Sequence, residues 1–274
     1  MKKAWFLTVL ATTILTAISW YYFNAGTLAL SAIKQDAQVI QTYTSQLLDS
    51  AINTHDKAYK TRPPTTTVSY NQAQAQITKD RTKLAHAYKK AANSKDKQAI
   101  LEQARHKYIA ATITLLPYWY GTSWDFYGTS TTPQQGRIAC GYYVTTVLED
   151  SGLAVERNKL AQQASENIIK SLTDEPHIKR FSNRPFDEFI SEVDAMGAGL
   201  YIVGLDFHVG YLWHDGEQMY FIHSTSYPFR GVIEEPANTS HNLKNSKYRV
   251  VGKISDDDAL IKKWLLQESI STRT

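Results

Sequence analysis

The side chains of one cysteine and two histidines could together perform nucleophilic chemistry in this chain. Cys140 is the only cysteine in the 274-residue sequence, and His208 and His223 follow it in a region rich in β-forming residues. A thiol, a base and a group that orients the base are the components of a cysteine nucleophile. The sequence therefore predicts a catalytic Cys140–His208–His223 site, provided that the fold brings the three side chains together.

A predicted hairpin explains how the two histidines would meet. Asp215-Gly216 lies between two β-rich runs, and Asp-Gly in that position is a strong signal for a two-residue turn. Pairing outward from this turn places His208 opposite His223 on one face of the sheet, with Cβ atoms roughly 4.5–5.5 Å apart. Two imidazoles so placed can share a hydrogen bond, and one ring then orients the other.

The residues after Cys140 favour a helix that begins at the cysteine. Apolar residues recur with helical spacing as far as Leu148, and Ser151-Gly152 ends the run. At a helix N-terminus, the helix dipole and free N–H groups lower a thiol pKa, and the same N–H groups can stabilise an oxyanion. The ordinary alternative for a lone cysteine is a small buried apolar residue without chemistry.

The other histidines and a metal site are competing interpretations. His177 and His241 are interpreted as structural or exposed residues. His214 flanks the turn and is expected to face solvent, although it is a rival orienter if the hairpin register shifts. Two histidines and one cysteine could also bind zinc, but the chain lacks the closely spaced ligand pairs of zinc motifs. We therefore expect no metal and no cofactor.

The N-terminus indicates export. Lys2 and Lys3 precede an uncharged apolar run that extends to Phe23. Residues 1–23 are therefore predicted to be a signal peptide, or an uncleaved membrane anchor of about twenty residues. Both alternatives place the rest of the chain outside the cytoplasm, in the periplasm or cell envelope, either secreted or held by the N-terminal segment.

Residues 30–115 are predicted to form a helical accessory region. Helices are expected over 29–52, 71–92 and 94–115, with a Pro-containing break at 61–68 and Asn93-Ser94 as a cap. Residues 31–110 carry 13 Lys and Arg against 6 Asp and Glu, within a chain of net charge +4. A solvated helix face is the favoured interpretation of this charge, and contact with an anionic surface is the alternative. Nucleic acid is not an expected partner, because the chain contains no recognised reader motif.

Residues 117–274 are predicted to form the chemical domain, with an α+β fold. An aromatic, Gly-punctuated stretch at 117–128 would line a groove or cap the core. The helix that begins at Cys140 is followed by predicted strands at 199–204, 207–213, 218–223, 231–233 and 248–254, and by a last amphipathic helix from Asp256 to Leu266. A helix that precedes a small antiparallel sheet is typical of α+β proteins.

Residues 117–254 resemble the NlpC-type, papain-like peptidases of bacterial cell walls. The resemblance rests on four segments in the family's order: Pro117-Tyr118-Trp119-Tyr120-Gly121, Ala139-Cys140-Gly141-Tyr142, His208-Val209-Gly210-Tyr211-Leu212 and Phe221-Ile222-His223-Ser224. The family usually has Asp-Cys-Ser-Gly around its nucleophile, so the cysteine segment of this chain is a divergent one.

The resemblance implies a role for each of these residues. Cys140 would be the nucleophile, His208 the base and His223 the orienter, with a thiolate–imidazolium pair at rest. The backbone around Cys140 and Gly141, together with Tyr118, would help to form the oxyanion hole. Attack on an amide would give a thioester that water hydrolyses.

The expected function is that of a cysteine amidase or endopeptidase. The family's usual substrate is the stem peptide of peptidoglycan, and an exported bacterial chain would meet that polymer or another envelope peptide. The alternative is a non-catalytic papain-like module that binds wall peptides while the basic helices hold it to a surface. A third class, an effector that uses the same chemistry on a foreign wall, is also open.

Overall fold

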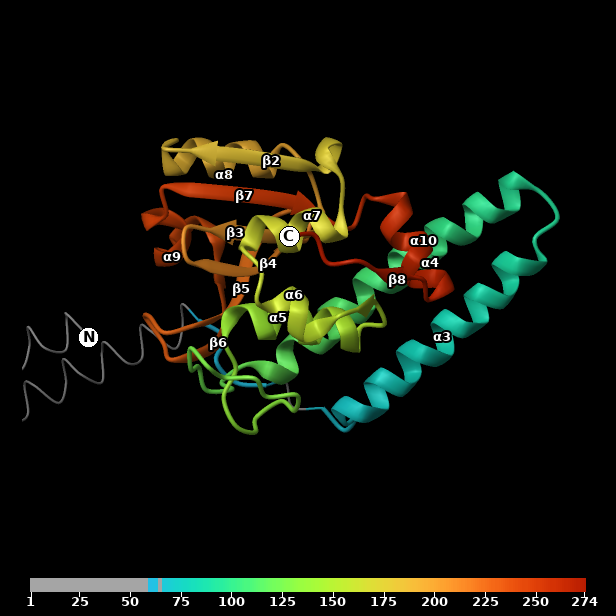
Figure 1. Ribbon diagram of the computed structural model, residues 1–274, viewed down its shortest axis with the longest axis horizontal. Helices are drawn as coiled ribbons and strands as arrows, with labels where there is room; N and C mark the ends of the chain where they lie inside the picture. The colour runs from blue at the N-terminus through green and yellow to red at the C-terminus, as the bar shows by residue number, and fades with distance from the viewer. Residues whose placement is uncertain (1–58, 64–65) are drawn as a thin grey trace, which may run out of the picture. The chain divides into compact units, whose positions relative to one another are not determined.

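The computed structural model describes residues 59–63 and 66–274 (Figure 1). Residues 59–274 form one compact unit. The predicted export or anchor segment at 1–23 and the helix expected at 29–52 lie outside the described residues. Among the helices that are described, none is long and apolar enough to cross a membrane.

A six-stranded antiparallel sheet lies at the centre of this unit. Its strands follow the order β2 (Ile178–Ser182), β7 (Tyr248–Lys253), β3 (Gly199–Leu205), β4 (His208–His214), β5 (Met219–Thr225) and β6 (Gly231–Pro236). Strand β3 is buried along its whole length and lies between β7 and β4. No strand is predicted from the sequence over the residues of β2. Helices around an antiparallel sheet confirm the α+β class.

The described helices are distributed along the whole of this unit. They are α3 (Tyr70–Lys90), α4 (Ser94–Leu115), α5 (Cys140–Asp150), α6 (Arg157–Ala161), α7 (Ser165–Leu172), α8 (Phe186–Asp194), α9 (His241–Asn245) and α10 (Asp258–Leu266). A short parallel pair joins β1 (Ala154–Val155) to β8 (Ser269–Ile270). The side chains of Asn93 and Asp257 cap the N-termini of α4 and α10 by accepting backbone N–H groups.

Helix α5 is fastened to the two strands that carry the histidines. The Tyr211 hydroxyl on β4 donates to the carbonyl of Val144 in α5 at 2.8 Å. The Ser224 hydroxyl on β5 donates at 2.7 Å to the carbonyl of Ile138, just before the helix. All four residues are fully buried, so both hydrogen bonds are shielded from water. These two hydrogen bonds therefore fix the position of the start of α5 relative to the sheet.

The long helices α3 and α4 belong to the same core as the sheet. The Tyr70 hydroxyl of α3 donates to Asp150 at the end of α5 at 2.7 Å, and accepts the indole N–H of Trp119 at 3.0 Å. Tyr108 of α4 packs against Trp264 of α10 with ring centroids 5.8 Å apart. The described helices of the expected accessory region therefore share a hydrophobic core with the expected chemical domain.

The β4–β5 hairpin has a wider turn than the sequence predicts. His214 pairs with Met219 and Tyr211 with Ile222, which leaves a four-residue loop at 215–218. The Asp215 carboxylate accepts the backbone N–H groups of residues 217 and 218 at 2.8 Å each, and this side-chain capping stabilises the wider loop. The predicted two-residue turn is wrong, and the register differs by two residues. A shift of two keeps every side chain on its predicted face.

Continued toward the start of β4, this register brings Gly210 beside His223. A Cβ atom built on Gly210 would lie 2.8 Å from the His223 Cβ and 2.7 Å from the Phe221 ring. These distances are shorter than van der Waals contact, so only glycine allows the two strands to come this close.

We expect the Gly210→Ala substitution to lower the free energy of unfolding by about 2–3 kcal/mol, because the added methyl forces the Phe221 ring and β5 to move. Urea unfolding at neutral pH measures the change. Gly216→Ala, in the hairpin loop, is the control: its φ is +108° but nothing lies within 4 Å of the added Cβ, so only about 1 kcal/mol of backbone strain is expected. Equal losses in the two variants would contradict the close packing at Gly210.

Candidate active site

The structure brings His208 and His223 together as the sequence predicts. The His208 Nε2 atom lies 2.7 Å from the His223 Nδ1 atom, and the ring centroids are 4.9 Å apart. Because of the shifted register the two residues meet diagonally across β4 and β5, on the same face of the sheet. The missing side chain at Gly210 leaves room for this contact. The adjacency is confirmed, although the predicted direct pairing is not.

A buried carboxylate continues the chain of hydrogen bonds beyond His223. Glu235 on β6 places Oε1 at 3.1 Å from the His223 Nε2 atom, and the Ser240 hydroxyl donates to the same oxygen. Exposure is 0 % for His223 and 1 % for Glu235. Glu235 is not among the site residues predicted from the sequence. The available signal was the pair of adjacent acidic residues, Glu234 and Glu235, in the strand.

The direction of these hydrogen bonds fixes the tautomer of both rings when Glu235 is ionised. A carboxylate only accepts, so His223 donates from Nε2 and its Nδ1 atom accepts. The His208 Nε2–H then donates to His223, which leaves a lone pair on the His208 Nδ1 atom. This tautomer is the one that a base needs in order to take a proton from a thiol.

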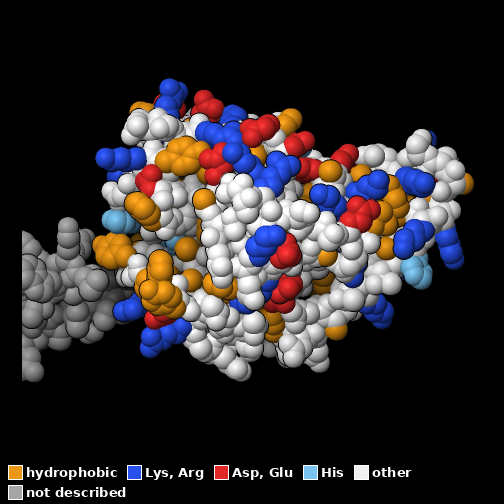
Figure 2. Space-filling view, viewed as in Figure 1, with side chains coloured by type: hydrophobic (Ala, Val, Ile, Leu, Met, Phe, Trp, Pro, Cys, Tyr) orange, Lys and Arg blue, Asp and Glu red, His pale blue; other side chains and the backbone are white. Residues whose placement is uncertain are grey.

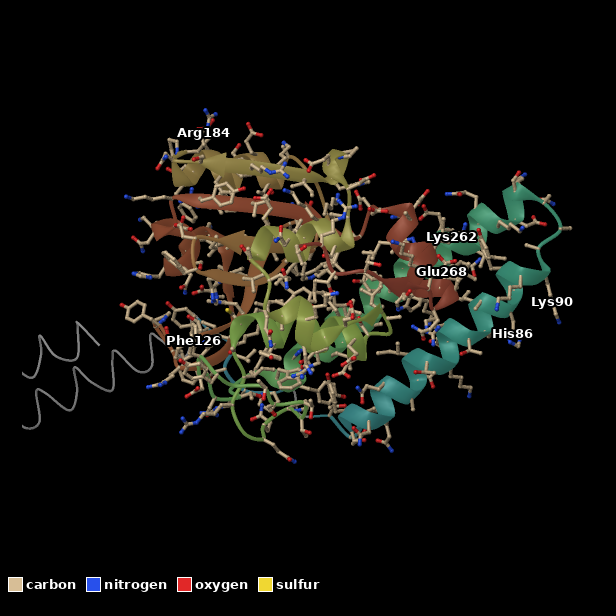
Figure 3. All side chains as sticks on the ribbon, viewed as in Figure 1. His86, Lys90, Phe126, Arg184, Lys262 and Glu268 are labelled. Atoms are coloured by element: carbon tan, nitrogen blue, oxygen red, sulfur yellow. The ribbon has the colours of Figure 1, made fainter. Side chains whose placement is uncertain are left out.

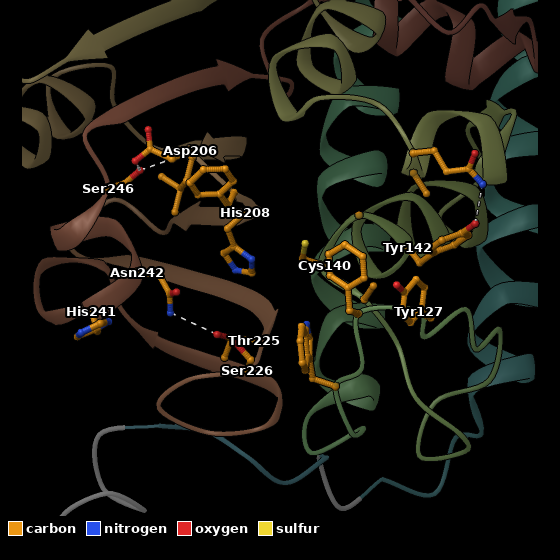
Figure 4. A pocket seen from close by; sticks show the side chains of 18 of the residues that line it. Tyr127, Cys140, Tyr142, Asp206, His208, Thr225, Ser226, His241, Asn242 and Ser246 are labelled. Atoms are coloured by element: carbon orange, nitrogen blue, oxygen red, sulfur yellow. Dashed lines mark hydrogen bonds between the residues drawn. The ribbon is translucent and has the colours of Figure 1, made fainter. Parts of the chain in front are cut away.

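Cys140 faces this histidine pair across a cavity. In Figure 4 the thiol, at the first residue of α5, points toward the His208 ring, which projects from the start of β4. The backbone N–H groups of Val209, Gly141 and Cys140 act on the sulfur and favour its thiolate. Because Val209 directly follows His208, this N–H group links the Cys140 sulfur to the strand that bears the predicted base. The structure therefore brings together all three residues of the predicted triad.

Burial determines the protonation state of the resting pair. Burial raises the pKa of the Cys140 thiol above its ordinary value, and outweighs the opposite effect of the three N–H groups. Burial, and the neighbouring His223 ring, lower the pKa of His208 well below 6.5. Both directions favour a neutral thiol and a neutral imidazole over the thiolate–imidazolium pair that the resemblance implies.

Gly141 and Tyr118, the two candidates for substrate or oxyanion contacts, differ in position. A Cβ on Gly141 would lie 2.4 Å from the carbonyl oxygen of Ala161, so the close approach of α6 explains why glycine follows the nucleophile. The N–H of Gly141 acts on the Cys140 sulfur and can reach an oxyanion formed there. The Tyr118 hydroxyl instead donates to the carbonyl of Val68 at 2.8 Å. Tyr118 does not line the cavity at Cys140, and the expected role does not fit this position.

The remaining histidines have other surroundings. His214, expected to face solvent, is buried, and its Nε2 atom lies 3.1 Å from Asp194. His241, interpreted as structural or exposed, is exposed and lines the cavity at Cys140. Within the described part of the chain, the potential metal-ligand atoms that gather within 4.8 Å are those of Asp174, His177 and Asp257. Asp257 already caps α10 there.

The cavity between Cys140 and His208 has a volume of about 740 Å³. A second cavity, of about 440 Å³, adjoins the same two residues on the side of α7. Both cavities also include Phe207, in the turn between β3 and β4. The thiol and the histidine therefore lie where two hollows meet, and a chain-like ligand could pass over them.

Comparisons of this chain with protein-family models, with curated proteins and with solved structures find no match.

Proposed function

We propose that this protein is a cysteine hydrolase that cleaves amide bonds in envelope peptides, with peptidoglycan stem peptides as the first substrate to test. The observation that carries the proposal is the continuous path from Glu235 through His223 and His208 to a cavity wall that faces Cys140. The order of these residues and the helix-on-sheet arrangement also support a divergent papain-like, NlpC-type domain. The envelope as the location rests on the sequence of residues 1–23.

The proposed reaction begins with a substrate carbonyl beside the thiol. The His208 Nδ1 atom takes the thiol proton while the sulfur attacks, and the backbone N–H groups at Cys140 and Gly141 donate to the developing oxyanion. The His208 imidazolium is stabilised by the hydrogen bond to His223. His208 then passes its proton to the leaving amine, which leaves a thioester. Water, activated by the same base, hydrolyses this thioester.

A non-catalytic binding module is the second candidate, and one observation favours it. The resting thiol is neutral and half-buried, as it would be in a protein that binds wall peptides without cleaving them. The relay favours the enzyme, because a binding module has no need of a buried, tautomer-fixing carboxylate behind a histidine pair.

Digestion of purified peptidoglycan separates the two candidates. We expect the wild-type protein to release new fragments, identified by mass, and the Cys140→Ala and His208→Ala variants to release none, since each lacks one partner of the attack step. His177→Ala is the matched control, because His177 contacts Asp174 away from the cavity, and it should cleave like wild type. Unchanged fragments from folded wild-type protein would remove wall peptides as the substrate.

The pH dependence of alkylation tests the protonation state of Cys140. A neutral resting pair predicts that the rate of labelling by iodoacetamide rises continuously with pH, with a midpoint above the ordinary thiol pKa of 9.0, since only the thiolate reacts. Mass spectrometry at a series of pH values measures the rate, and the single cysteine makes the labelled site unambiguous. A rate plateau between about pH 5 and 7 would instead indicate the thiolate–imidazolium pair.

Glu235 is predicted to act as a positioning residue through His223. Glu235→Gln keeps the side-chain shape but removes the charge that fixes both tautomers, so kcat should fall by about 10²-fold with little change in KM. ¹⁵N spectra of the histidine rings should also show a changed tautomer at His208. Glu234→Gln is the control: Glu234 is the adjacent strand residue, and it bonds Tyr120 and Lys60 instead. Equal kcat values for the two variants would exclude the relay.

A further inference from the structure

The walls of the larger cavity are aromatic on the side of Cys140. Tyr127 and Tyr142 lie on the Cys140 side of the cavity, away from His208, in Figure 4. Trp124, Phe126 and Phe207 also line the cavity. Several of these rings are open to solvent: the exposed fraction is 70 % for Phe126, 85 % for Tyr127 and 99 % for Phe207.

In Figure 2, apolar side chains gather at the left of the described surface. In Figure 3, Phe126 projects outward from the same side. Single exposed apolar residues are ordinary, but a group of large rings around a concave site indicates a binding surface. Tyr142 lies in α5 and the other rings lie on loops and turns, so they are available without unfolding.

The polar groups of the cavity are mostly bonded to one another. The amide of Asn242 donates to the carbonyl of Tyr227 at 3.0 Å, and the amide of Asn245 donates to the carbonyl of His241 at 2.8 Å. The amide of Gln162 donates to the Tyr142 hydroxyl at 3.1 Å. These hydrogen bonds hold the amide side chains against the cavity wall.

Charge is also scarce in this cavity. Among the described residues that line it there is no lysine or arginine, and the one carboxylate belongs to Asp206. Asp206 accepts from Ser246 and from the backbone N–H groups of Lys247 and Tyr248, at 2.7–3.1 Å. Arg157 and Arg230 pack on the rings of Tyr142 and Trp124 but do not line the cavity. A carboxylate placed inside would therefore find no lysine or arginine among the described residues that line the cavity.

We propose that the larger cavity is the acyl subsite of this enzyme and that it selects an uncharged, apolar residue beside the scissile carbonyl. The inference rests on the proposed hydrolase function and names the substrate class of the same site. The acyl part stays bound through both attack and hydrolysis, whereas the amine leaves after the first step. The larger and more apolar of the two cavities at Cys140 is therefore assigned to the acyl part.

A series of covalent probes tests this selectivity. Acetyl-Gly-X acyloxymethyl ketones, with X as Leu, Phe, Gln, Glu or Lys in both enantiomers, alkylate a cysteine that their peptide part positions. We expect the Leu and Phe probes to label Cys140 of the full chain at least about tenfold faster than the Glu and Lys probes, with Gln between them. Equal rates across the series would overturn the apolar subsite.

A variant with a charge at the cavity rim is a second test of the apolar selectivity. Tyr127→Arg places a cation at an exposed lining position, and it should reduce the Leu-to-Glu rate ratio severalfold. Val68→Arg adds the same charge at an exposed apolar residue outside this cavity, and it should leave the ratio unchanged. A ratio that responds equally to both variants, or to neither, would contradict the assignment of Tyr127 to the subsite.

The two proposals fail in different ways. If the probes label wild type at equal rates but fail to label His208→Ala, the nucleophile is active and only the apolar selectivity is wrong. If every probe labels wild type and His208→Ala equally, His208 is not the base, and the hydrolase proposal fails together with the subsite.

Discussion

The site depends on one buried carboxylate and on the hydrogen bonds that compensate for its burial. Glu235 is removed from water, and hydrogen bonds reduce the free-energy cost of burying a carboxyl group. Ser240 supplies one donor and also caps α9, and His223 supplies another. These hydrogen bonds therefore join β5, β6 and α9. When Glu235 is ionised, they also fix the direction in which the histidine pair donates.

Close backbone approach is the second constraint, and it explains two glycines of the resembling segments. Gly210 allows β4 and β5 to bring His208 and His223 into contact, and Gly141 allows the α6 carbonyl at Ala161 to lie against the first turn of α5. A side chain at either position would displace a member of the triad. The hydrogen bonds of Tyr211 and Ser224 to the start of α5 then hold the thiol opposite the histidines.

The sequence predicted the parts of the site that depend on local pattern. Period-two alternation survives a register shift of two residues, so the contact of His208 with His223 was predicted correctly from an incorrect turn. The Asp215 capping that widens the loop is a side-chain effect that the Asp-Gly signal does not contain. Glu235 was out of reach for a different reason: it meets His223 only through the pairing of β5 with β6, and Tyr118 was misplaced because its hydroxyl bonds to Val68, far away in the chain.

The neutral resting pair gives the apolar cavity a role in the chemistry as well as in binding. A lone thiol that stays protonated reacts slowly with adventitious electrophiles and oxidants. In the proposed reaction, proton transfer to His208 becomes favourable when a carbonyl accepts the sulfur's electrons and the N–H groups receive the oxyanion. An apolar acyl group that displaces water from the cavity strengthens those interactions by lowering the local dielectric constant. Substrate selectivity and activation of the nucleophile would then arise from the same contact.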